Sequence, residues 1–156
     1  MIFRMSSTDS ALAANEAAIR RLAALYARAM DRNEPQLLSE IFTADALLEG
    51  PGFAMRGHGE ICAIPGMLSQ MYSRTLHQIH NQTVSIAGDR AEAETYCTAN
   101  HLTALGDGAA SNLVWAMRYH DRLRRENGHW RFEQRSAVID WTETRPAQFT
   151  SLPASG

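Results

Sequence analysis

The segment Arg74–Asn81 lies where a helical pattern gives way to a strand pattern. It contains two histidines, His77 and His80, and ends in Asn81. Alternate residues of a strand share a face, so His77 and Asn81 are expected to point one way and His80 the other. A neutral imidazole in a partly apolar pocket can accept a proton near pH 7, which makes His77 a candidate general base. The alternative is that both histidines are surface residues or satisfied core residues.

Two further candidates lie on the first predicted helix. Asp31 stands at its C-terminal end, where the helix dipole makes a carboxylate mildly unfavourable. We expect it to pair with a histidine across a pocket, fix the tautomer and strengthen the base; a solvated turn residue is the alternative. Tyr26 lies on the apolar stripe of the same helix. It is either a core residue or a hydrogen-bond donor to a substrate oxygen.

The second long strand places small side chains on one face, which then ends in a histidine. These residues are Ala93, Thr95, Cys97, Ala99 and His101. Because the strands of His77 and His101 are expected to be neighbours, the two imidazoles are positioned to reach one cavity. The alternative is that the small residues accommodate a helix packed on the sheet.

The third long strand carries Trp115 on one face and Arg118 on the other. Arg118 is a candidate to bind an anionic or carbonyl group. The structural alternative is an ion pair with Asp121, Glu133 or Asp140. None of the six histidines lies in a pattern typical of a metal site, and no glycine-rich phosphate loop is present, so no metal or cofactor is predicted.

Composition is typical of one soluble globular domain: 156 residues, of which 45% are hydrophobic and 21% charged. A net charge of −2 gives no broad attraction to nucleic acid or anionic lipid. All fifteen basic residues are Arg, which excludes a Schiff-base lysine. Two isolated cysteines and the lack of a signal-like or membrane-spanning apolar run favour a reduced, cytoplasmic protein.

Helical patterns come first and strand patterns follow, which predicts an α+β domain with helices covering one face of a long, curved antiparallel sheet. Such a sheet encloses an apolar cavity. The expected helices cover Ala11–Met30, a short segment from Glu34 and Gly57–Tyr72; the expected strands cover Ala46–Glu49, Phe53–Arg56, Thr75–Ala87, Ala91–Leu105, Asn112–Arg125 and His129–Thr142. Residues 1–11 are predicted to be a flexible leader, 12–145 the domain and 146–156 a loose tail.

A series of short motifs, in this order and spacing, resembles the SnoaL-like branch of the nuclear transport factor 2-like superfamily. The motifs are Tyr26-x4-Asp31, Ile-Phe-Thr-Ala-Asp-Ala at 41–46, Arg-Gly-His-Gly-Glu-Ile at 56–61, His77-x3-Asn81, Gly-Asp-Arg-Ala-Glu-Ala at 88–93, Arg-Tyr-His-Asp-Arg-Leu at 118–123, and Gly-His-Trp-Arg-Phe at 128–132 with Arg135 and Asp140-Trp141. The resemblance covers residues 12–145.

The resemblance implies a cone-shaped α+β barrel with a deep apolar pocket. In similar dehydratases and dehydrochlorinases, an Asp ending the first helix and a His on the first long strand form an acid–base dyad, and Asp31 and His77 match them. His101 resembles the second histidine of such a dehydratase, and Tyr26 matches a pocket aromatic. Met30 stands where that dehydratase has a tyrosine.

Together these observations predict a cofactor-independent lyase or isomerase, dehydratase-like, for a small hydrophobic polycyclic or aromatic substrate. His77 would take a proton from carbon, Asp31 would orient it, and His101 or Tyr26 would assist the oxygen. The expected pocket residues are Met30, Asn81, Cys97, Trp115 and Arg118. The alternatives are a non-catalytic ligand-binding or oligomerisation domain and the small subunit of an aromatic-ring dioxygenase. A homodimer or homotrimer is expected.

Overall fold

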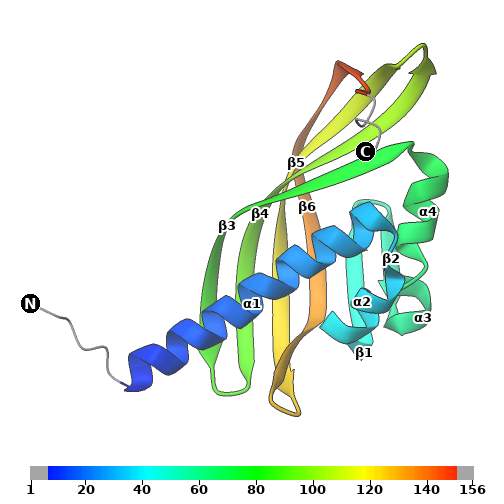
Figure 1. Cartoon of the computed structure of the whole chain (residues 1–156). Helices are drawn as coiled ribbons and strands as arrows, with labels where there is room; N and C mark the ends of the chain where they lie inside the picture. The colour runs from blue at the N-terminus through cyan, green and yellow to red at the C-terminus, as the bar shows by residue number, and fades with distance from the viewer. Residues whose placement is uncertain (1–6, 151–156) are drawn as a thin grey trace, which may run out of the picture.

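Four helices lie on one side of a strongly curved six-stranded sheet in the computed structural model, which describes residues 7–150 (Figure 1). The elements are α1 (Ser7–Arg32), α2 (Pro35–Ile41), β1 (Phe42–Gly50), β2 (Phe53–Arg56), α3 (Gly57–Ile61), α4 (Ile64–Met71), β3 (Arg74–Ala87), β4 (Arg90–Gly106), β5 (Ala109–Glu126) and β6 (His129–Gln148). The long helix α1 crosses the concave side, as the predicted α+β architecture requires.

The sheet has the strand order β2-β1-β6-β5-β4-β3. The four long strands β3–β6 form the predicted antiparallel meander. In addition, β1 pairs with β6 in parallel, so the six-stranded sheet as a whole is mixed. A parallel pair needs a long crossover, and here the crossover contains β2, two helices and three long strands.

Both ends of the domain extend beyond their predicted limits. Helix α1 begins at Ser7, inside the predicted leader, and β6 continues to Gln148, inside the predicted loose tail. The strand continues because β5 begins at Ala109 and supplies it with partners, the last of which joins Ala109 to Gln148. The remaining parts of the predicted leader and tail, residues 1–6 and 151–156, lie outside the described residues.

Helix α1 buries the apolar stripe that the sequence predicts. The buried residues are Ile19, Leu22, Ala23, Tyr26, Ala29 and Met30. The helix stops because Asn33 adopts a left-handed conformation with φ 51°, which asparagine tolerates better than most residues. Asp31 is thereby held in the last turn, next to β3.

An irregularity in β3 reverses the alternation of its side chains. Between Ile79 and Gln82 the strand contains one more residue than its partner β4, which is the signature of a β-bulge. Up to Ile79 the odd-numbered side chains face the helices, and from Gln82 the even-numbered ones do. Asn81 is therefore exposed, and the prediction that it shares a face with His77 is wrong.

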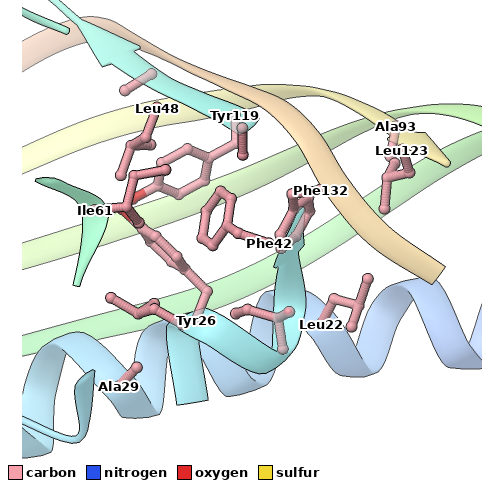
Figure 2. Close-up of a cluster of buried hydrophobic side chains, with 14 of the residues drawn as sticks. Leu22, Tyr26, Ala29, Phe42, Leu48, Ile61, Ala93, Tyr119, Leu123 and Phe132 are labelled. Atoms are coloured by element: carbon pink, nitrogen blue, oxygen red, sulfur yellow. The ribbon is translucent and has the colours of Figure 1, made fainter. Parts of the chain in front are cut away.

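Aromatic rings from helix and sheet form the centre of the core, as Figure 2 shows. The Tyr26 ring meets Tyr119 at 5.4 Å and Phe42 at 6.1 Å, both edge-on, and Phe42 contacts Phe132 at 5.2 Å between centroids. These are the separations at which aromatic pairs add to the stabilisation from burial. The rings join α1, β1, β5 and β6 into one core.

An ion pair is fully buried beside these rings. Arg135 donates from Nε and Nη2 to the two carboxylate oxygens of Asp121, at 2.8 and 2.9 Å, and neither side chain is accessible to solvent. The two residues face each other across β5 and β6. Three rings surround the guanidinium: Tyr119 at 4.1 Å, Phe132 at 4.2 Å and Tyr26 at 4.4 Å.

The Asp121→Asn variant is expected to lower the free energy of unfolding by about 3–5 kcal/mol, because it leaves the buried Arg135 charge without a counter-charge. Urea denaturation measures this loss. The matched control is Asp140→Asn, which breaks the partly exposed pair with Arg118 and should cost far less. Equal losses in the two variants would contradict the assignment of a charge-compensating role to Asp121.

Candidate active site

The carboxylate of Asp31 accepts three hydrogen bonds from β3. Its Oδ1 accepts from the ring Nδ1 of His77 at 2.6 Å and from the Thr75 hydroxyl at 3.0 Å, and its Oδ2 accepts from the backbone N–H of His77 at 2.7 Å. Only 14% of the Asp31 side chain and 6% of the His77 side chain are exposed. The structure thus brings together the two residues that the sequence singled out.

This contact lowers the pKa of Asp31 and sets the tautomer of His77. Burial acts to raise the pKa of the Asp31 carboxyl, but the hydrogen bonds and electrostatic attraction of His77, with the hydrogen bond from Thr75, outweigh it and bring the pKa below its ordinary value of 3.8. An ionised carboxylate can only accept hydrogen bonds, so Nδ1 of His77 carries the proton. The other ring nitrogen, Nε2, is then the basic atom.

His101 lies beside His77 on the neighbouring strand, with 6.0 Å between ring centroids. Its Nδ1 donates to the Leu113 carbonyl at 3.1 Å, and its ring packs between Trp115 at 4.6 Å and Tyr72 at 4.8 Å. Burial lowers the pKa of His101, which favours the neutral ring. In that form its Nε2 accepts a hydrogen bond.

A cavity of about 250 Å³ lies against the two histidines. Its wall is apolar and aromatic, and it includes Met30 and Trp115, as the sequence predicted. Helix α4 contributes Met67 and Met71, which are 45% and 62% exposed and therefore lie at the mouth. An apolar cavity with a few polar groups is the usual form of a small-ligand site.

Two phenols face the same cavity, Tyr26 from α1 and Tyr119 from β5. Burial raises the pKa of Tyr26 to about 12, while the charge of Arg135 and a hydrogen bond with Tyr119 act to lower it. Burial likewise raises the pKa of the Cys97 thiol to about 12, and that thiol is also hydrogen-bonded to Tyr119. Burial also raises the pKa of Tyr119, so both phenols and the thiol are protonated at neutral pH.

Three predicted pocket residues lie elsewhere. Arg118 is on the outer face of the sheet and donates to both carboxylate oxygens of Asp140, at 2.7 and 2.9 Å, which is the structural alternative considered above. Cys97 faces inward as predicted but is buried beneath the residues that line the cavity. Asn81 is displaced to the outer face by the β3 bulge.

Tyr119 and Tyr72 are among the site residues that the sequence did not single out. Tyr119 shares the predicted inner face of Trp115, so strand alternation already indicated its direction. Tyr72 follows α4 and reaches His101 only because that helix folds back over the cavity. No local pattern indicates such a contact.

A larger hollow of about 520 Å³ lies on the sheet and is lined by polar groups, among them Glu94 and His120. These two already pair with each other at 3.0 Å. Within residues 7–150, no three His, Cys, Asp or Glu side chains are grouped to hold a metal ion. None of the helices in this range has the length and apolar character needed to cross a membrane.

The Asp31→Asn variant is expected to be destabilised at neutral pH, by an amount that shrinks as the pH falls below about 4. The pKa of this carboxyl is lower in the folded protein than in the unfolded chain, so its charged form stabilises the fold above the unfolded pKa. That contribution is lost as the pH falls through the folded pKa. Urea titrations at several pH values measure it.

The control for losing a carboxylate as such is Asp107→Asn, at an exposed hairpin turn. A difference between wild type and Asp31→Asn that stays constant down to about pH 3 would show that the charge of Asp31 does not stabilise the fold.

Comparison with known proteins places this geometry in a family. The family model described as a SnoaL-like domain matches residues 11–136. None of the curated proteins matches the sequence significantly.

Three similar solved structures share the fold. Hexachlorocyclohexane dehydrochlorinase LinA type 2 superposes with a TM-score of 0.79 at 19% identity, covering 91% of this chain and 96% of that one. The type 3 enzyme from Novosphingobium barchaimii gives 0.76 at 17% identity, covering 90% and 95%. A Novosphingobium aromaticivorans protein, provisionally assigned as a scytalone dehydratase, gives 0.75 at 19% identity, covering 96% and 99%.

At such identities the likeness between structures shows a shared fold alone. The family model spans most of the chain, including Asp31, His77 and His101. The chain therefore belongs to the SnoaL-like domain family.

Proposed function

We propose that this protein is a cofactor-independent lyase or isomerase that removes a proton from carbon in a small, hydrophobic, cyclic substrate. The observation that carries the proposal is the 2.6 Å hydrogen bond between Asp31 and His77 beside an apolar cavity. A histidine oriented by a carboxylate in this way is a positioned general base.

In the proposed reaction, Nε2 of His77 takes the proton from carbon, and the imidazolium that forms is stabilised by Asp31 at Nδ1. The electron pair of the broken C–H bond either expels a leaving group on the adjacent carbon or moves onto a conjugated oxygen. Tyr26 can donate to that oxygen. His101 in its neutral form accepts a hydrogen bond from a substrate hydroxyl and so positions it.

The arrangement favours an enzyme over a passive ligand-binding module. Binding an apolar molecule needs only the apolar wall of the cavity. A largely buried carboxylate is costly to keep, and here a hydroxyl and a backbone N–H hold it against one imidazole. The dehydrochlorinases that share the fold carry out eliminations by name, which agrees with the proposed reaction class.

The test begins with a thermal-shift screen of uncharged hydroxylated aromatics, bicyclic ketones and polyketide-like compounds. Each hit is then incubated with the protein and followed by mass spectrometry. The His77→Ala variant is expected to bind the hit but to convert it about 10²–10⁴-fold more slowly, because the general base is missing. Asp31→Asn should also slow conversion, because the His77 tautomer is no longer fixed.

The matched control is His80→Ala, which removes an exposed histidine of the same strand that contacts Thr98 at 2.8 Å. It should leave conversion unchanged. If a ligand binds wild type and His77→Ala equally and neither protein converts it, the catalytic proposal is contradicted and the protein is a ligand-binding module.

A further inference from the structure

Tyr119 lies directly behind the proposed reaction centre and has no part in the proton transfer described above. Its ring meets Tyr26 edge-on at 5.4 Å, and Tyr26 in turn meets His77 edge-on at 6.4 Å. Figure 2 shows the two phenols reaching toward each other from α1 and β5. Both side chains are buried, and both line the cavity.

The hydroxyl groups belong to a chain of hydrogen bonds. Tyr119 is hydrogen-bonded to the Tyr26 hydroxyl and to the Cys97 thiol. When two hydroxyls share one hydrogen bond, one donates and the other keeps its own proton for a further acceptor. Successive donors in a low-dielectric interior strengthen one another. The pair can therefore direct a strengthened O–H donor into the cavity.

A positive charge stands behind both rings. The Arg135 guanidinium lies 4.1 Å from the Tyr119 centroid and 4.4 Å from the Tyr26 centroid. Its Nη1 is buried and has no hydrogen-bond acceptor among the described residues. Burial raises the pKa of both phenols and keeps them protonated, while the charge of Arg135 acts in the opposite direction and favours negative charge near the phenol oxygens.

We propose that the Tyr26–Tyr119 pair binds, through its one free O–H, the oxygen atom on which negative charge develops as His77 removes the proton. This inference rests on the proposed function and assigns Tyr119 as a further residue of the catalytic site. The pair would supply to an enolate-like or phenolate-like oxygen a fixed donor of the kind that such charge requires.

The same surroundings define the class of substrate as an uncharged ring compound with a carbonyl or hydroxyl oxygen. No arginine is among the described residues that line the cavity, and the Arg135 guanidinium is fully buried behind the tyrosine rings, where a ligand cannot contact it. The Asp31 carboxylate beside the cavity repels a permanent anion. Carboxylate and phosphate substrates are therefore disfavoured.

The experiment uses 4-nitrophenol as probe, because absorbance distinguishes its phenolate from its phenol. Wild type is expected to bind 4-nitrophenol and shift it to the phenolate form, since His77 accepts the phenol proton and the tyrosine pair holds the oxygen. Tyr119→Phe should bind the phenolate about 10-fold more weakly, as the loss of one hydrogen bond to a charged group predicts. Tyr26→Phe should weaken it at least as much.

The matched control is Tyr96→Phe, the same change on a tyrosine whose side chain is exposed on the outer face. It should bind both forms of the probe like wild type. Thermal unfolding of each variant verifies the fold, and Tyr26→Phe keeps the test informative if Tyr119→Phe does not fold.

Three results would overturn the inference: no saturable binding to wild type, binding of the neutral phenol alone, or unchanged phenolate affinity in both Phe variants. The outcome is separable from that of the proposed function. If both Phe variants convert a substrate as fast as wild type, the proposed function stands and the inference about the tyrosine pair fails. If phenolate binding depends on the tyrosines but no hit is converted, the tyrosine pair binds an oxygen anion and the proposed function fails.

Discussion

The candidate site depends on the three hydrogen bonds that β3 donates to Asp31. A buried carboxylate is unfavourable unless donors replace the water that it loses. Here the donors are a hydroxyl, a backbone amide and an imidazole of one strand, so the last turn of α1 is held against β3. That attachment sets the His77 tautomer and also places Tyr26, earlier on the same helix, at the cavity.

The sequence could predict what short-range rules decide. Helical spacing placed Tyr26 and Met30 on the buried stripe and Asp31 at the C-terminal end of the same helix, where the structure has them. Period-two alternation placed His77 and His101 on the inner face, where the structure has them. These predictions needed only the direction of each side chain from its own backbone.

The remaining features are decided by contacts between distant segments. One extra residue in β3 moved Asn81 to solvent, and alternation cannot reveal where such a bulge falls. The parallel pairing of β1 with β6 depends on the whole crossover between them. Arg118 and Arg135 are both strand arginines with a carboxylate partner, but only Arg135 faces the core. Which of the two arginines faces the core depends on the pairing register of the strands, and no local sequence pattern shows that register.

Stability alone is a poor explanation for the buried pair of Arg135 and Asp121. Apolar residues of similar volume often replace such a pair without loss, or with a gain of about 1–4 kcal/mol. The pair also leaves Nη1 of Arg135 buried without an acceptor among the described residues, which adds a further cost. What an apolar replacement could not supply is a fixed positive charge behind two phenols. Because those phenols line the cavity beside His77, the charge stands behind the place where the proposed reaction would develop an oxyanion.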